Sequence, residues 1–287
     1  MTMPEIQQEA YISVFLNSAL ATGEVEGVLT IFLLFLARMF PIIAQSPFLG
    51  ARVLPHPVKV SLAISLFVIF FPQMLLLTTT PIGFNFNALL LLFKEILIGF
   101  ILGFIISIPF SIVQNAGMII DHQRGGASLM VNDPTIQNQS SPVGTLLNMV
   151  LIFLFWVVDI PFLFIDAIFT SYEIVPPDQF INPNFFDAAS PFRKTQIELL
   201  NKVMVVSIQL ATPALLAILM TDVFLGIVNR LAPQVQITFL GMPLKSLLGL
   251  GVICFGWNLL TTQMVKDSYV WLNSINDVFK LMKTPIP

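Results

Sequence analysis

Apolar residues along this chain are gathered in six long blocks, which polar connections separate. The blocks run over Val28–Ala44, Val58–Leu77, Ala88–Val113, Leu146–Phe169, Val203–Val228 and Leu247–Val265. A helix crosses the hydrocarbon core of a bilayer with about 20 apolar residues, whereas a barrel strand has about 9–11 residues that alternate strictly. The pattern therefore predicts an all-α membrane protein with about six long hydrophobic helices.

The composition agrees with this class and argues against others. The 287 residues are 56% hydrophobic and only 10% charged, whereas about a quarter of the residues in a soluble domain are charged. The net charge of −3 and the lack of a Lys/Arg cluster argue against nucleic-acid binding. The N-terminal stretch MTMPEIQQEA carries no positive charge, so we expect no cleaved signal peptide and a first apolar block that stays in the protein.

The sequence predicts no catalytic, cofactor or metal site. His56 and His122 have no companion ligands at metal-binding spacing. Cys254 is the only cysteine and lies inside an apolar block. The glycines near His122 do not follow the spacing of a phosphate-binding loop.

The connection between the last two blocks has an unusual composition. It contains the polar stretch Asn229–Gln236, with Pro233, and the stretch Gly241–Lys245, with Pro243. Two prolines and a glycine continue a helix poorly. We therefore expect a shaped turn between the two blocks, with the helices ending on either side of it.

A polar helix face precedes this turn. Asp222, Gly226 and Asn229 stand at the helical spacing i, i+4 and i+7, and Arg230 lies close to the same face. A carboxylate, an amide and a guanidinium at the end of a hydrophobic helix are costly in lipid. This face is therefore expected to meet another protein surface or an aqueous cavity.

Arg38 interrupts the first block and is followed by Pro41. It either faces a partner or a pore, or snorkels to the membrane interface from a shorter helix. In the third block, Glu95 shares one helix stripe with two glycines four residues apart, a spacing that permits close helix–helix approach in membranes. Because adjacent residues point about 100° apart on a helix, no ion pair is expected between Lys94 and Glu95.

Two carboxylates lie in the fourth block, on either side of Pro161. Asp159 and Asp166, seven residues apart, can share a helix face and form a proton or cation relay. Alternatively, Pro161 breaks the helix at an interface and exposes both acids to water. No basic or histidine residue stands at helical spacing from them, which favours the second interpretation.

The connection over Gln114–Gly144 is long, polar and glycine-bearing. We predict a flexible loop with one acid, Asp121, and one base, Arg124. Such a loop can fold into a cavity as a plug or constriction, or can be an ordinary exposed connection. The residues alone leave both interpretations open.

Several stretches carry a resemblance that extends along nearly the whole chain. They are Ala37–Pro41, Pro55–Lys59, Lys94–Gly103, Gly117–Gly125, Asn132–Pro134, Gln139–Ser141, Asp222–Gln236 and Gly241–Lys245. Together they resemble the SctT/FliR/SpaR family of type III secretion export-apparatus proteins. The form Asp121-His-Gln-Arg124-Gly125 is more similar to the virulence (injectisome) branch than to the flagellar branch.

This resemblance implies a non-enzymatic, multi-pass protein of the bacterial inner membrane. Members of the family join SctR-type and SctS-type subunits, together with a SctU-type switch protein, in a helical export gate for unfolded substrate proteins. The implied fold is a set of helical hairpins whose packing depends on these partners. It divides the chain into an R-like helical part over residues 1–200, with the loop 114–144, and an S-like hairpin and tail over residues 201–287. No cofactor and no nucleic acid are implied.

The resemblance also implies roles for individual residues. A region that narrows or plugs the pore would contain Gly117, Asp121, Arg124, Gly125 and Gly126. Candidate assembly contacts are Arg38, Glu95, Gly99, Gly103, Asp222, Asn229, Arg230, Pro233, Gln234, Pro243 and Lys245. The competing class is a proton- or ion-coupled secondary transporter that uses the acids Asp159, Asp166 and Asp222.

Overall fold

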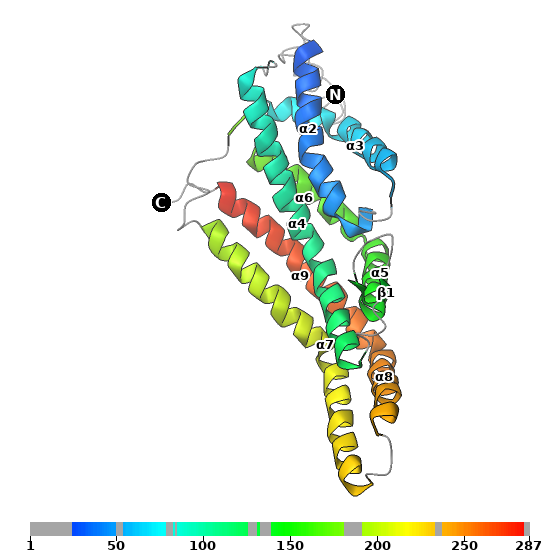
Figure 1. Cartoon of the computed structure of the whole chain (residues 1–287). Helices are drawn as coiled ribbons and strands as arrows, with labels where there is room; N and C mark the ends of the chain where they lie inside the picture. Colours follow the sequence, from blue (N-terminus) through cyan, green and yellow to red (C-terminus); the bar gives the residue numbers. More distant parts are fainter. Residues whose placement is uncertain are drawn as a thin grey trace, which may run out of the picture. The chain divides into compact units, whose positions relative to one another are not determined.

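The computed structural model describes residues 25–49, 54–78, 83, 85–125, 131–132, 139–180, 191–232 and 237–283. Figure 1 shows the order of the elements along the chain. They are α2 (Val25–Gln45), the 3-10 turn η1 (Pro47–Leu49), α3 (His56–Leu77), α4 (Phe86–Gln123), β1 (Val131–Asn132), β2 (Gln139–Ser140), α5 (Pro142–Val157), α6 (Ile160–Ile174), α7 (Pro191–Leu231), α8 (Ile237–Phe255) and α9 (Trp257–Lys283).

The prediction of an all-α membrane protein is confirmed. Among the described residues, four helices, α2, α3, α4 and α7, are long and apolar enough to cross a membrane, and the number rises to six if each of two bent helix pairs is one span. The only strands among the described residues are the two-residue β1 and β2, which pair antiparallel. Each of the six apolar blocks of the sequence corresponds to one span or one bent pair.

The sequence predicted one helix for each of the fourth and sixth blocks. In the structure, each of these blocks is a pair of helices. The fourth block breaks between α5 and α6 at Asp159, whose φ of 57° lies in the left-handed region. Pro161 follows in the first turn of α6, where a missing N–H costs nothing. The sixth block breaks at Gly256, and the helices on either side are bent by 67°.

Two segments expected to be irregular are helical. Residues 114–123 are the last turns of α4, and residues 237–245 open α8, so the turn between the last two blocks is shorter than expected. Pro243 lies in the second turn of α8, where it removes a single helical hydrogen bond while α8 packs along α7.

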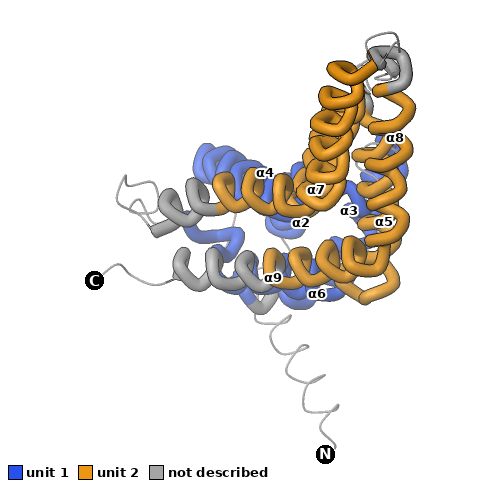
Figure 2. The backbone as a smooth tube through the Cα atoms, turned by 90° about the horizontal axis from the view of Figure 1, so that it is seen from below, with its two compact units in different colours: residues 1–107, 162–195, 272–287 blue, residues 108–161, 196–271 orange. Residues whose placement is uncertain are grey.

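The chain forms two compact units that interleave along the sequence, coloured separately in Figure 2. Unit 1 comprises residues 1–107, 162–195 and 272–287, and unit 2 comprises residues 108–161 and 196–271. These units are defined by internal packing. The division into an R-like and an S-like part at residue 200 concerns resemblance to other subunits and stays a prediction.

Unit 1 has an aromatic core between α2, α3 and α6. The ring of Phe70 stacks on that of Phe169 with 4.0 Å between centroids, and Phe35 stacks on Tyr172 at 5.8 Å. Phe67 meets the edge of Phe35 at 5.4 Å. These contacts bury large apolar surfaces and position the polar residue cluster that α2, α4 and α6 share.

Unit 2 is built around an antiparallel hairpin of α7 and α8. A Cβ added at Gly249 would lie 3.0 Å from Ile218, and one at Gly241 would lie 3.3 Å from Leu225. From Gly241 to Gly249 along α8, the contact on α7 moves back from Leu225 to Ile218. The two helices therefore run in opposite directions. The described contacts thus show an α7–α8 hairpin, whereas the S-like hairpin and tail over residues 201–287 that the resemblance implies stay a prediction.

Candidate functional site

The candidate site residues fall into three groups: a buried ionic cluster in unit 1, a buried carboxylate cluster in unit 2, and the end of the α7–α8 hairpin. Figure 1 shows the helices that carry them. Each group is described by its own contacts. In every group, the local sequence explains how the backbone positions the polar atoms.

Arg38 is the centre of the cluster in unit 1. Its guanidinium forms a two-pronged ion pair with Glu95 of α4, in which Nη2 donates to Oε1 at 2.9 Å and Nε donates to Oε2. Nη1 also donates to the Ser171 hydroxyl at 3.1 Å, and Nη2 to the Val175 carbonyl at 2.8 Å. The side chains of Arg38 and Glu95 have no exposed surface. Neither snorkelling nor a charge facing a partner or a pore describes this arrangement, because the guanidinium is buried against residues of its own chain.

Tyr172 completes the surroundings of Arg38. The guanidinium carbon lies 3.9 Å from the centroid of the Tyr172 ring, within the range of a cation–π interaction. A fork of donors over an aromatic face and against a carboxylate suits arginine and would not suit lysine. The contacts of Arg38 and Glu95 thus tie α2, α4 and α6 together within one unit.

Lys94 contradicts the expectation that it would not pair with its neighbour. Its Nζ lies 2.7 Å from Oε1 of Glu95. The same ammonium donates to the carbonyl oxygens of Pro176, Pro177 and Gln179 at 2.8, 3.1 and 3.0 Å. The expectation failed because it considered only the directions of the Cα–Cβ bonds. The long lysine side chain bends toward three carbonyl oxygens that follow α6, and these lie beside the carboxylate.

The glycine stripe on α4 forms a close approach to α2. A Cβ at Gly99 would overlap the carbonyl group of Arg38, and one at Gly103 would lie 2.8 Å from the carbonyl oxygen of Pro41. The predicted packing seam is therefore present, and it lies inside unit 1. Since both contacts advance in the same chain direction, α2 and α4 pack in parallel here. Any further role of these glycines in assembly stays a prediction.

Asp121 is the centre of the cluster in unit 2. Its fully buried carboxylate accepts hydrogen bonds from the Ser141 hydroxyl, the Val143 backbone N–H at 2.9 Å and Arg124 Nε at 2.7 Å. Arg124 Nη2 lies 2.5 Å from the same carboxylate. The end of α4 and the start of α5 are therefore joined at one charged group.

Ser141 is a residue that sequence reasoning did not select as a site. It caps α5, because its hydroxyl accepts from the Gly144 N–H at 2.9 Å, and Pro142 takes the first helical position. A serine followed by a proline at the start of an apolar run is a known signal of a helix start, so the cap could have been found. Its second partner, Asp121, is 20 residues away and could not.

Arg124 and Gly125 follow the end of α4 and lie next to α8. Arg124 Nη1 donates to the Ser246 hydroxyl at 3.1 Å. Gly125 has a φ of 86°, the left-handed conformation that commonly follows a helix end and favours glycine. A Cβ there would lie 3.6 Å from Met242 of α8. Gly126, the last plug candidate, lies outside the described residues.

The hairpin end carries one ion pair and two exposed polar residues. Lys245 Nζ pairs with Asp222 Oδ1, and the two side chains keep 24% and 37% of their surface exposed. Asn229 and Arg230 are exposed in the last turn of α7. Pro243 is exposed on α8, whereas Pro233 and Gln234 lie outside the described residues. The predicted polar face therefore includes a charge partner for Asp222 on the opposite helix.

Two acids of the transporter hypothesis, Asp159 and Asp166, do not share one continuous helix. Asp159 occupies the turn after α5 and Asp166 lies in α6, and both are exposed. No basic partner within ion-pair distance is found for either in the described part of the chain. The interpretation in which the helix breaks and the acids face outward therefore fits these positions. Over the same described ranges, no group of acidic, histidine or cysteine side chains could hold a metal ion.

Comparisons with known proteins agree with this picture. The family described as "Bacterial export proteins, family 1" matches residues 29–269. Yop proteins translocation protein T of Yersinia pestis is 33% identical over 161 residues, which cover 56% of this chain and 60% of that protein's length. Secretion system apparatus protein SsaT of Salmonella typhimurium is 30% identical over 217 residues, 75% of this chain and 80% of that protein.

A flagellar relative matches to a similar extent. Flagellar biosynthetic protein FliR of Bacillus subtilis is 30% identical over 214 residues, 75% of this chain and 81% of that protein. The matched region of the family contains all of the described polar clusters. On the basis of these matches and its apolar helical fold, the chain belongs to the SctT/FliR/SpaR family of bacterial export proteins.

Proposed function

We propose that this chain is a subunit of the type III secretion export gate. With SctR- and SctS-type partners it would form the inner-membrane channel through which unfolded substrate proteins leave the cytoplasm. The relatives are named as translocation, secretion-apparatus and flagellar biosynthetic proteins, which supports a role in an export apparatus. The chain's apolar helices and its family support a multi-pass protein of the inner membrane.

The observation that carries the proposal is an uncovered apolar stripe on α7. The stripe repeats every three or four residues, and the exposed fractions of its members range from 54% to 80%. Its members are Leu216, Met220, Val223, Ile227 and Leu231. Only 28% of the apolar window of α7 is buried inside the chain. Lipid could cover such a stripe, but the same helix ends in the exposed polar residues Asn229 and Arg230, which favour a protein partner.

Gly226 strengthens the case for a protein neighbour. It lies beside this stripe, and apart from its own helix backbone no atom of the described residues lies within 4 Å of the position that its Cβ would take. A glycine on an open helix face allows the backbone of another helix to approach closely. In the proposed gate, the S-like part over residues 201–287 presents this face of the hairpin to an adjacent SctS-type subunit, and Asp222, Asn229, Arg230 and Lys245 lie at its polar end.

The pore-lining role is proposed for the end of α4. Gly117 and Asp121 pack against α5, so their part is to anchor the segment. His122 and Gln123 are exposed in the last turn of α4, and Gly125 follows them. We propose that the residues after this anchor, with Gly125 and Gly126, narrow the channel of the R-like part. A SctU-type protein would act on the same assembly as its switch.

The proposal is tested by photo-crosslinking in the assembled apparatus with a stalled substrate. A crosslinking amino acid in place of His122 should form adducts with the substrate. One in place of Met220 should form adducts with an apolar partner subunit, and the matched control at the buried Ile218 should form neither. Secretion without any adduct at either test position would contradict the proposal.

The transporter alternative has its own readout. The purified chain in liposomes should show no proton-coupled solute uptake, and it should co-purify with two small hydrophobic membrane partners when these are co-expressed. Uptake that Asp159→Asn, Asp166→Asn or Asp222→Asn abolishes would establish a transporter instead and overturn the gate assignment.

A further inference from the structure

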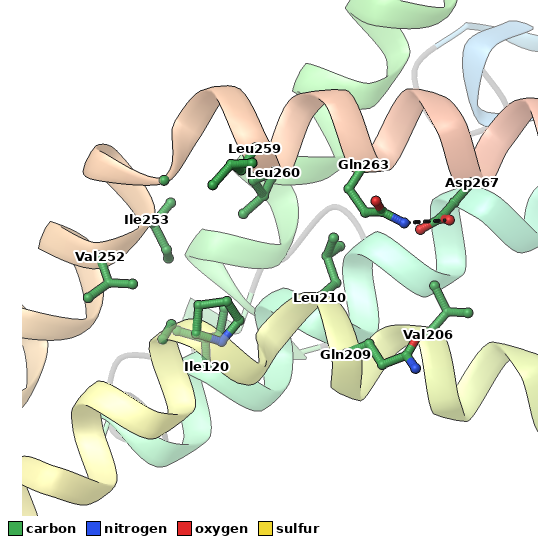
Figure 3. Close-up of a pocket in the computed structure, with 13 residues that line it drawn as sticks. Ile120, Val206, Gln209, Leu210, Val252, Ile253, Leu259, Leu260, Gln263 and Asp267 are labelled. Carbon is green, nitrogen blue, oxygen red and sulfur yellow. Dashed lines mark hydrogen bonds between the residues drawn. The ribbon is translucent and has the colours of Figure 1, made fainter.

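Unit 2 contains a groove that the proposed gate function does not use. It lies between α7 and the bent pair α8–α9, with Ile120 of α4 at its floor, and its volume is about 360 Å³. Figure 3 shows Leu210, Ile253 and Leu260 directed into it from three helices. The break at Gly256 and the proline at position 213 shape this space, because both interrupt otherwise regular helices.

The two ends of the groove differ in chemistry. One end is apolar and is lined by Val252, Ile253 and Leu259, whereas the other end carries Gln209, Gln263 and Asp267. Asp267 accepts a hydrogen bond from Gln263 Nε2 at 2.9 Å. Across the described residues, its carboxylate has no cation within ion-pair distance. A ligand that fits would therefore have an apolar body and a cationic donor at one end.

A lysine lies over an aromatic ring one helical turn from Asp267. Lys202 of α7 places its ammonium 5.9 Å from the centroid of the Trp271 ring. Trp271 is one helical turn after Asp267, and both residues line a smaller adjoining cavity together with Leu210. The surroundings of the polar end thus contain one acid and one base, which is complementary to a zwitterionic head group with one ammonium and one phosphate.

The lining of the groove is mostly apolar, as the surroundings of an acyl chain are. The groove also lies at membrane-spanning segments, where α7 spans Leu199–Leu231 and the bent pair runs from Gly241 to Trp271. Acyl chains are therefore the abundant neighbours that can enter it.

We propose that this groove binds one phospholipid with a phosphoethanolamine head group. The acyl chain would occupy the apolar end, the primary ammonium would donate to Asp267, and the phosphate would pair with Lys202. Binding fills a cavity between α4, α7, α8 and α9, and so stabilises the bent arrangement of unit 2. This inference does not depend on the gate assignment.

Native mass spectrometry of the purified full chain in detergent tests the proposal. The delipidated protein is titrated with phosphatidylethanolamine, phosphatidylglycerol or phosphatidylcholine of identical acyl chains. Phosphatidylethanolamine should bind about tenfold more tightly than the other two, because only it carries both a phosphate and a primary ammonium that can donate to a carboxylate. Equal affinity for the three lipids would overturn the proposal.

Variants locate the binding. Asp267→Asn keeps the shape of the side chain and should remove the preference for phosphatidylethanolamine. Leu210→Trp fills the groove and should lower the affinity for all three lipids. Asp166→Asn, an exposed acid of unit 1, is the matched control and should change nothing. The proposal fails if Asp267→Asn and Asp166→Asn behave alike, or if a crosslinker at position 210 captures a partner subunit in place of a lipid.

Discussion

The backbone of Gly117 in α4 lies directly against the backbone of Gly144 in α5. A Cβ on Gly117 would overlap the Cα and N atoms of Gly144, and one on Gly144 would lie 2.9 Å from the carbonyl oxygen of Gln114. The two helices therefore meet through glycines on both sides. This contact stands one helical turn from Asp121, so the buried carboxylate cluster can form only if the backbones come this close.

Gly117→Ala is accordingly expected to be destabilising. The added methyl must separate α4 from α5, at a cost of about 1–3 kcal/mol in the free energy of unfolding. Gly226→Ala is the matched control, since no other part of the described structure lies within 4 Å of its Cβ position and alanine is the better helix former by about 1 kcal/mol. Thermal unfolding of the purified protein in detergent measures both. Equal melting temperatures for the two variants would show that the close contact is absent.

Arg38 and Glu95 are expected to behave as a coupled pair. Arg38→Met or Glu95→Met alone leaves a buried charge without its partner, at a cost of about 3–5 kcal/mol. The double variant Arg38→Met/Glu95→Met should lose much less than the sum of the single losses. A double-mutant cycle on unfolding in detergent provides the measurement. Strictly additive losses would contradict a direct buried interaction.

A series at position 141 separates helix capping from the bond to Asp121. Ser141→Ala loses both and should cost about 1–3 kcal/mol. Ser141→Thr keeps the hydroxyl and should remain close to the parent. Asp is as good a capping residue as Ser, but Ser141→Asp places a second carboxylate against Asp121 and should be at least as destabilising as alanine. If aspartate instead rescues stability, capping alone accounts for the role of Ser141.

The ion pair of the hairpin should matter for assembly and hardly for stability. Because Asp222 and Lys245 are partly exposed, Lys245→Gln should lower the free energy of unfolding by only about 0–1 kcal/mol. Co-purification of the partner subunits should weaken in Asp222→Lys and Lys245→Asp, and should recover in the double charge exchange. Recovery of co-purification in the double variant would show that the ion pair itself, and not either single charge, is required. If neither single variant reduces co-purification, the hairpin end is not an assembly contact.

Much of the fold follows from the apolar blocks. The α3 helix ends at Leu77, as the predicted block does, and begins at His56, with Pro57 in its first turn, just ahead of the block's first residue, Val58. The glycine stripe of α4 likewise follows from spacing. Such features depend on residues within one turn or one helix of each other, so the sequence contains the relevant information locally.

Prolines and ionic contacts show where local reasoning ends. Pro161 follows a real break, whereas Pro243 lies inside α8, because the packing of α8 along α7 outweighs one lost hydrogen bond. The partners of Lys94 are three carbonyl oxygens more than 80 residues away, and Arg38 reaches Glu95 across 57 residues. Side-chain chemistry indicated that these charges needed partners. It could not identify partners that only the tertiary fold brings near.

The buried carboxylate cluster at Asp121 has a consequence for how the sequences of such proteins can diverge. The chain leaves α4 at Arg124 and enters α5 at Ser141, and both residues bind the same carboxylate. A segment whose two ends are fixed at one point can gain or lose residues without moving the helices it joins. Doubling its length adds only about 0.6 kcal/mol of closure entropy. Insertions between positions 126 and 138 should therefore cost little folding free energy. Through them, secretion systems can change the contacts of this segment while the surrounding helices keep their packing.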